Sequence, residues 1–344
     1  MTWSSPADWL RLTTIDTHAA GEPLRVIISG SEGGFPVLPG DSILAKRRYA
    51  REHLDHLRRA LMFEPRGHAD MYGCLLTPPP TPDGDFGVLF IHNEGYSTMC
   101  GHGIIGLTTV VFETGLKLAD GPTPILRLDT PAGRVTARAE WDGTRVRSVS
   151  FENVPSFVYA LDQTVNVPGL GQVRYDVAFG GAFYAFCDAD DLGVRLTADD
   201  FRKLIDVGMW VKRAVMEALP IHHPFESDLG FLYGTIICGA AHSADAHSRN
   251  VCIFAEGEVD RSPTGTGVSA RVALEHARGR LPLGQSFTVE SIIGTTFTGR
   301  VAQTTSFGEY AAIIPEVTGS AWITGRHEFL VAPDDPLREG FILR

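Results

Sequence analysis

The sequence lacks the features that would point to a membrane or a nucleic acid. No apolar run is long enough to span a bilayer, and the first residues, MTWSSPADWLRLTTID, lack the basic start and apolar core of a signal peptide. Basic residues are outnumbered by acidic ones, 30 to 41, and a net charge of −11 disfavours binding to polyanions. We therefore expect no membrane and no nucleic-acid partner.

Cysteine is scarce, and its positions show no disulfide framework. An odd number of widely scattered thiols suits a reducing compartment better than a secreted, cross-linked fold. We expect a cytoplasmic protein with free cysteines, which are Cys74, Cys100, Cys187, Cys238 and Cys252.

The remaining composition, 44% hydrophobic and 21% charged, is ordinary for a globular protein, and 344 residues suit two domains. β-branched runs bounded by turns predict strands at 24–30, 87–95, 146–154, 249–259 and 309–317. Apolar residues at helical spacing predict helices at 7–12, 44–64 and 197–219. The basic residues of the second helix predict a solvated face, comprising Lys46, Arg47, Arg48, Arg51 and Arg58.

Two stretches share one layout. STMCGHGIIGLTTVVFETG places Cys100 fifteen residues before Gly115, and RSPTGTGVSARVALEHARG places Thr264 fifteen before Gly279. Glycines follow at the first and third positions, an apolar helix comes next, and the last glycine suits a helix C-terminus. The repeat predicts two similar domains that face each other across a cleft.

The two predicted helix starts offer a site for an anion. A helix N-terminus presents free N–H groups and a partial positive charge, and glycine lets a ligand approach this backbone closely. The same field lowers the pKa of a cysteine, so Cys100 is predicted to be a base or nucleophile. The alternative is an ordinary buried cysteine.

Other motifs carry little chemistry. GHGIIG matches a dinucleotide fingerprint, but the second copy has Ala270 in place of its third glycine. No acidic residue follows at the end of a strand to hold a ribose, so we expect no nicotinamide cofactor. Neither of two further groups of polar residues has the spacing of a zinc site. We expect both to be structural or cleft-lining and to bind no metal; they are Glu64, His68 and Asp70, and His222 and His223.

Six stretches in order resemble the proline racemase family over nearly the whole chain: DTHAAGEPLRVI, MFEPRGHADMYG, MCGHGIIGL, FGGAFYAF, SRNVCIFAEGEVDRSPTGTG and PDDPLREGF. The resemblance implies an α+β, diaminopimelate epimerase-like fold, with two α/β domains that each wrap a curved sheet around a central helix. We expect the first domain at 10–155, completed by the segment 328–344, and the second at 156–327. The active site would lie between them.

The resemblance also implies a reaction. Racemases of the family usually carry a cysteine at both helix starts, one on each face of the substrate α-carbon, whereas this chain has Thr264 at the second. A threonine hydroxyl is too weak an acid for this task, so inversion should fail. The branch with cysteine and then threonine dehydrates trans-3-hydroxy-L-proline to Δ1-pyrroline-2-carboxylate, a hydro-lyase reaction without a cofactor.

The resemblance assigns the predicted site residues as follows. Cys100 takes the α-proton, and Thr264 occupies the opposite face. The helix-start amides around Gly101, His102, Gly265 and Thr266 bind the substrate carboxylate, and Asp260 accepts hydrogen bonds from the ring ammonium.

Several roles stay open. His102 either positions backbone or acts in catalysis, and either Cys100 or His102 protonates the leaving hydroxyl. Thr264 either fills the space of a thiol or touches substrate, and Asp260 could instead stabilise a helix start. Phe183 and Tyr184 wall the pocket or pack in the core.

Rival functions are 4-hydroxyproline epimerase or proline racemase and, in another class, a non-catalytic imino-acid binding protein. Cys100 disfavours the last, because a binder has no use for a thiol there. The partners we expect are a small imino acid and a second copy of the chain, in a homodimer.

Overall fold

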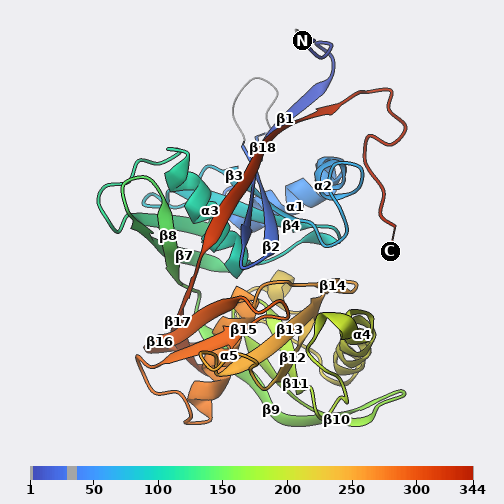
Figure 1. Ribbon diagram of the computed structural model, residues 1–344, viewed down its shortest axis with the longest axis vertical. Helices are drawn as coiled ribbons and strands as arrows, with labels where there is room; N and C mark the ends of the chain where they lie inside the picture. Colours follow the sequence, from blue (N-terminus) through green and yellow to red (C-terminus); the bar gives the residue numbers. More distant parts are fainter. Residues whose placement is uncertain (1–2, 29–36, 344) are drawn as a thin grey trace.

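Two lobes, each a curved sheet around one helix, make up the molecule (Figure 1). The computed structural model describes residues 3–28 and 37–343. The helix of the first lobe is α3 (Gly101–Glu113), and that of the second is α5 (Gly265–Ala277). Strands of its own lobe surround each helix, and the two helices also touch each other.

The sheet of the first lobe runs in the order β18-β1-β2-β3-β4-β6-β7-β8, with the short β5 added to β4. Its strands are β1 (Leu10–Ala19), β2 (Glu22–Ile27), β3 (Tyr72–Thr77), β4 (Phe86–His92), β5 (Gly95–Tyr96), β6 (Ile125–Thr130), β7 (Gly133–Trp141), β8 (Val146–Glu152) and β18 (Ala321–Val331).

The sheet of the second lobe runs in the order β9-β10-β11-β12-β13-β15-β16-β17, and β17 pairs with β9 to close it. The short β14 is added to β13, and β17 also pairs with β8 of the first lobe. Its strands are β9 (Ser156–Val167), β10 (Gly171–Phe179), β11 (Phe183–Asp188), β12 (Leu232–Gly239), β13 (Ser248–Phe254), β14 (Glu258–Val259), β15 (Ser286–Glu290), β16 (Thr296–Phe307) and β17 (Tyr310–Gly319).

The pairing pattern repeats between the lobes. In the first lobe the parallel pairs are β2–β3 and β4–β6, and in the second they are β11–β12 and β13–β15. The neighbouring pairs in each sheet are antiparallel, and α3 follows β5 as α5 follows β14. The structural repeat predicted from the two helix starts is therefore confirmed.

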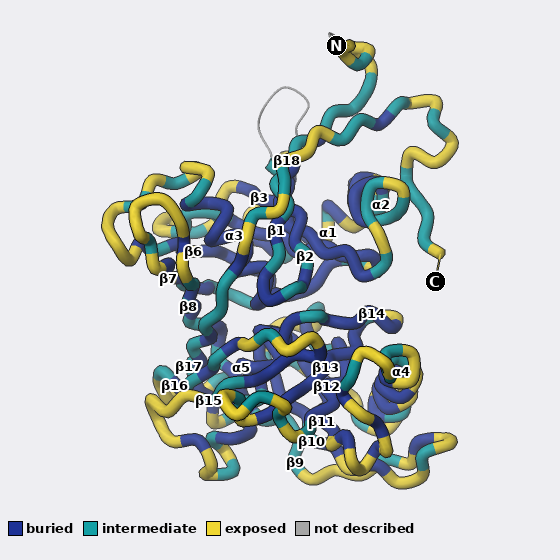
Figure 2. Tube along the Cα trace, viewed as in Figure 1, coloured by how far each residue is buried: buried dark blue, intermediate teal, exposed yellow. Residues whose placement is uncertain are grey.

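The central helices are buried on nearly every side, as their apolar sequences predict. Every residue of α3 except Glu113 is buried, and each apolar side chain there contributes about 1.5–3 kcal/mol through burial. Figure 2 shows the same contrast across both lobes, with buried strands inside and exposed residues on the outer loops. The glycines predicted to end the helices, Gly115 and Gly279, have φ of 72° and 71°.

The remaining helices lie outside the sheets: α1 (Ile43–His53), α2 (Asp55–Met62) and α4 (Phe201–Ala218), with 3-10 turns η1 (Ala198–Asp200) and η2 (Ser227–Leu229). The helix predicted at 44–64 is in fact two, because Leu54 leaves helical geometry. None of the described helices is long and apolar enough to cross a membrane.

The helix predicted at 7–12 is wrong. Residues from Leu10 onward form β1, in which Leu10 pairs with Val331 and Leu12 with Phe329. The apolar spacing was compatible with a helix, but a strand more than 300 residues away decides the local conformation.

The solvated basic face predicted on α1 and α2 is also wrong in part. The side chains of Lys46, Arg47 and Arg58 are buried, whereas Arg48 and Arg51 are exposed. Each buried cation donates to backbone carbonyls, since Lys46 reaches the oxygen of Pro78, Arg47 that of Tyr96 and Arg58 that of His92. These cations tie the helices to the sheet.

The strand pairing supports a proposed division of the chain. We propose that the first domain comprises 10–155 and the second begins at 156, as expected from the sequence. Since β18 pairs with β1 along its length, the return to the first domain would begin at Ala321 instead of 328.

Candidate active site

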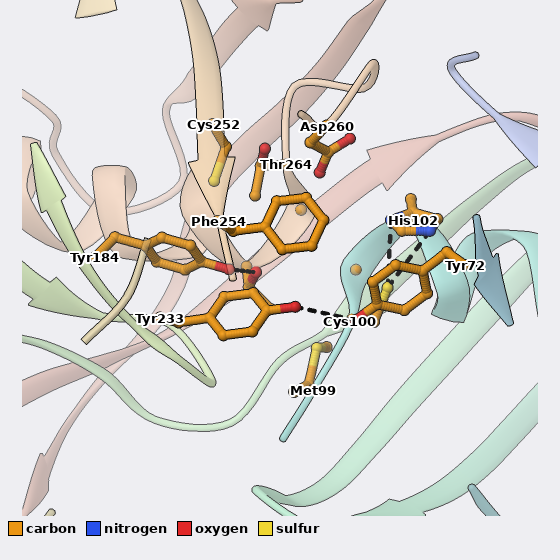
Figure 3. A pocket seen from close by; sticks show the side chains of 13 residues that line it. Tyr72, Met99, Cys100, His102, Tyr184, Tyr233, Cys252, Phe254, Asp260 and Thr264 are labelled. Atoms are coloured by element: carbon orange, nitrogen blue, oxygen red, sulfur yellow. Dashed lines mark hydrogen bonds between the residues drawn. The ribbon is translucent and has the colours of Figure 1, made fainter. Parts of the chain in front are cut away.

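A pocket lies where the two helix starts meet, and both lobes contribute to its wall (Figure 3). About 290 Å³ of open space lies between its lining side chains, part of it continuous with solvent. All seven site residues predicted from the sequence line it: Cys100, Gly101, His102, Asp260, Thr264, Gly265 and Thr266.

The helix starts touch through two glycines. A Cβ added to Gly265 would lie 2.6 Å from the Cα of Gly101, and a Cβ on Gly101 would overlap the Cα of Gly265. Any side chain here would push the lobes apart. The first N–H groups of both helices, which have no partner within a helix, therefore converge on one point with their partial positive charges. This arrangement suits a carboxylate.

Cys100 is the N-cap of α3 and is 4% exposed. Its sulfur accepts a hydrogen bond from the Gly103 N–H at 3.3 Å and lies 3.2 Å from Nδ1 of His102. The thiol is thus fixed at the edge of the pocket, beside the converging amides.

The prediction that the helix start lowers the pKa of Cys100 is wrong. Burial raises the pKa of the thiol well above its usual value, and the Gly103 N–H lowers it by less. Both lobes contribute to this burial, which a helix-start argument does not include. The resting group is therefore the thiol.

His102 is a neutral ring. Burial lowers its pKa to about 3, and a hydrogen bond to the Pro23 backbone raises it only slightly. The ring packs edge-on against Tyr72, with 4.8 Å between centroids. Its side chain therefore lies in the pocket wall against the thiol and holds no charge near neutral pH.

Thr264 departs from the geometry of Cys100. Its φ is 66°, a left-handed value that a β-branched residue seldom adopts, whereas φ of Cys100 is −147°. Its side chain does not cap α5, and its buried Oγ1 faces Asp260 and Cys252, where its hydrogen bonding opposes the rise in pKa of both groups. Strain of about 1–3 kcal/mol is typical of such a backbone and tends to occur at functional sites.

Asp260 is a buried carboxylate on the Thr264 side of the pocket (Figure 3). One oxygen accepts the Ser262 N–H at 2.8 Å. Burial raises the pKa of Asp260 to about 6, although hydrogen bonds from Ser262 oppose the shift. The group is mostly ionised at pH 7 and would favour a cationic ligand.

The sequence reasoning missed most of the remaining wall, which comprises Tyr72, Met99, Tyr233, Cys252 and Phe254. The Tyr72 hydroxyl donates to Ser97 at 2.5 Å and lies 3.5 Å from the hydroxyl of Tyr233 on the other lobe. A signal was present: MYGCLL and LYGTII, at 71–76 and 232–237, repeat the same pattern at the starts of β3 and β12.

The structure assigns different positions to Phe183 and Tyr184, which the sequence left open. The hydroxyl of Tyr184 lies 2.7 Å from Oγ1 of Thr266, and this tyrosine lines the pocket. Phe183 packs in the core against Phe157 and Phe179.

The polar groups around Asp70 and His223, which the sequence suggested as structural or cleft-lining, do not line the pocket. Asp70 forms an ion pair with Arg261 at 2.8 Å, and His223 packs against the rings of Phe179 and Phe307. Within residues 3–28 and 37–343, no three histidine, cysteine or acidic side chains are grouped to hold a metal ion.

Comparison with known proteins bears on this geometry. The chain is 48% identical to a trans-3-hydroxy-L-proline dehydratase of Colwellia psychrerythraea, over 98% of this chain and 94% of that one. It is 45% identical to a 3-hydroxyproline 2-epimerase of Burkholderia multivorans, over 97% and 98%.

A solved hydroxyproline epimerase of Agrobacterium vitis, with bound trans-4-hydroxy-L-proline, superposes with a TM-score of 0.92 at 32% identity and covers 98% of this chain and 96% of its own. The fold predicted from the sequence is confirmed by this match. The family model described as proline racemase matches residues 14–342. The chain therefore belongs to the proline racemase family.

Proposed function

We propose that this protein dehydrates trans-3-hydroxy-L-proline to Δ1-pyrroline-2-carboxylate. The observation that carries the proposal is asymmetry: a thiol, Cys100, occupies one helix start of the pocket and a hydroxyl, Thr264, the other. Full-length relatives at 45–48% identity that are named as dehydratases of this substrate support it.

The carboxylate of the substrate would bind the converging amides of Gly101, His102, Gly265 and Thr266. These donors would also stabilise the negative charge that develops as the α-proton leaves. The Asp260 carboxylate would hold the ring ammonium. An ammonium brought into the pocket favours loss of the Cys100 thiol proton to solvent, and the thiolate then removes the α-proton.

Loss of water completes the reaction. In the trans isomer the 3-hydroxyl lies on the same face of the ring as the α-hydrogen. One group on that face could therefore remove the α-proton and then protonate the leaving hydroxyl. The pKa of His102 is about 3, so its protonated, proton-donating form is scarce near neutral pH. This favours Cys100 as the group that protonates the leaving hydroxyl. The C3–O bond breaks as water forms, and the enamine that remains tautomerises to the cyclic imine.

A C2-epimerase is the second candidate, because a relative of the same length carries that name. Thr264 disfavours it, since inversion requires a second proton donor on the opposite face. A hydroxyl without ionisation near neutral pH supplies none readily.

The direct test is incubation of the purified protein with trans-3-hydroxy-L-proline, trans-4-hydroxy-L-proline and L-proline. We expect a product that traps with o-aminobenzaldehyde from the first substrate alone, and no inversion of the other two. Inversion without imine formation would favour the epimerase, and binding without turnover would favour an imino-acid binding protein.

The profile of kcat/KM against pH should have a descending acid limb that reports protonation of Asp260. Its ionised form binds the ammonium, so kcat/KM should fall about tenfold per pH unit below pH 6. Asp260→Asn should remove this limb and lower kcat/KM at pH 8 by about 100-fold. In Ser262→Ala the carboxylate loses a hydrogen bond that lowers its pKa, so the limb should move to higher pH. An unchanged limb in Asp260→Asn would assign it to another group.

We further propose that the enzyme is a cytoplasmic homodimer without a cofactor. The proposed chemistry uses only a thiol, backbone amides and a carboxylate. The five cysteines are free and buried, which suits a reducing compartment. The homodimer rests on the family resemblance.

A further inference from the structure

The tip of the β1–β2 hairpin, Ala19–Glu22, reaches from the first lobe onto the second beside the active site. Oγ1 of Thr295 donates to the carbonyl of Ala20 at 2.7 Å, and a Cβ on Gly21 would overlap the side chain of Ile293. Oε2 of Glu22 accepts the backbone N–H of Arg261 at 2.7 Å. The tip therefore contacts two separate loops of the second lobe.

Glu22 is fully buried at this junction, and its Oε1 has no hydrogen-bond partner among the described residues. Burial raises its pKa well above the usual value, and the carboxylates of Asp260 and Asp70 raise it further, whereas Arg261 lowers it. These surroundings favour the protonated acid over the carboxylate, and Oε2 can accept the Arg261 N–H in either form.

The N–H that Glu22 binds belongs to the peptide that follows Asp260. The Arg261 side chain is fixed as well, because Nη1 pairs with Asp70 of the first lobe at 2.8 Å and donates to the Val259 carbonyl at 2.7 Å. On the far side, the Ser262 N–H holds the Asp260 carboxylate. The conformation of Asp260 thus depends on contacts from the opposite lobe.

We propose that Glu22 is a positioning residue that, by accepting the Arg261 N–H across the two lobes, orients Asp260 for the substrate ammonium. The inference rests on the proposed function, in which Asp260 binds that ammonium. It extends the site to a residue that lies outside the pocket lining, and it requires the acceptor oxygen of Glu22 and not its charge.

Three variants test this role: Glu22→Ala, Glu22→Gln and the matched control Thr295→Val, which removes the hydrogen bond from the second lobe to the Ala20 carbonyl. Glutamine keeps the acceptor, so kcat and KM should stay within about threefold of wild type. Alanine should raise KM for trans-3-hydroxy-L-proline at least about tenfold with a smaller change in kcat. Thr295→Val should leave KM within about threefold.

A measurement without substrate separates this inference from the proposed function. Carboxyl ¹³C NMR of aspartate-labelled protein, with Asp260 assigned through Asp260→Asn, should show titration near pH 6 in wild type. Glu22→Ala should move this titration to lower pH as water reaches the carboxylate, whereas Glu22→Gln and Thr295→Val should not.

Equal effects of Glu22→Ala and Thr295→Val would reduce Glu22 to a docking contact. Equal damage from Glu22→Gln and Glu22→Ala would mean that its charge is required. Either result overturns the proposal. If wild type does not dehydrate the substrate, the proposed function fails, and the NMR titrations still decide whether Glu22 orients Asp260.

Discussion

Replacing Cys100 with serine is expected to lower kcat for dehydration of trans-3-hydroxy-L-proline by about 10³-fold or more, because a hydroxyl is a far weaker base than a thiolate at any accessible pH. Binding should survive, since the carboxylate and ammonium contacts use other groups. Trapping of the imine measures kcat, and calorimetric titration measures the affinity.

The buried thiol of Cys187, outside the active-site pocket, provides the matched control. Cys187→Ser should retain kcat within about fivefold, even if it lowers the stability of the fold. If Cys100→Ser kept most of the activity, the proton would have to leave by another group, and His102 would be the next to test. If wild type itself bound the substrate without turning it over, the binding-protein alternative would hold.

Burial opposes ionisation of Cys100 in the wild-type protein. The raised pKa means that little thiolate exists at Cys100 at neutral pH. In the proposed mechanism a substrate ammonium held at Asp260 would favour ionisation of Cys100 by bringing a cation next to the sulfur. This coupling would link Asp260 to Cys100, although the two residues belong to different lobes.

The sequence was sufficient to predict the helix starts and the residues around them. Position-by-position spacing and glycines placed Cys100 and Thr264 at equivalent points, and a close approach of two backbones needs glycine at both Gly101 and Gly265. These signals are local, because a helix start and its cap lie within a few residues. The pocket between the helix starts follows from the repeat.

Properties that depend on the opposite lobe could not be predicted in the same way. The pKa of Cys100 reflects burial by distant segments, and Lys46 and Arg47 can be buried because carbonyls more than 30 residues away accept their hydrogen bonds. The hydrogen bond between Glu22 and Arg261 joins residues 239 positions apart. A charge run on one helix carries no information about such partners.

The backbone at Thr264 is another property that alignment of the two repeats did not reveal. Equivalent positions in the two helix starts suggest equivalent geometry, but φ differs between 66° and −147°. A side chain at 264 therefore leaves the backbone in a direction different from that at 100. This difference limits how well a second thiol at 264 would mirror the first.

Thr264→Cys is expected to add inversion to a protein that otherwise lacks it. With a thiol on each side, one group can remove the α-proton while the other supplies a new proton to the opposite face. L-proline, which has no leaving hydroxyl, should then exchange its α-hydrogen in heavy water and racemise at least about tenfold above the wild-type background. Chiral chromatography measures the inversion, and NMR measures the exchange.

The rate should stay below that of Cys100-dependent dehydration, because the left-handed backbone aims the new sulfur imperfectly. Cysteine tolerates this conformation no worse than threonine, which is β-branched, so the fold should persist. Thr264→Ser is the control without a second thiol, and it should dehydrate without inverting. Loss of dehydration in Thr264→Ala with retention in Thr264→Ser would show that the hydroxyl takes part in the reaction. Inversion by wild type at a rate comparable to dehydration would contradict the one-thiol mechanism, since the proton on the second face would then come from a group other than a thiol at 264.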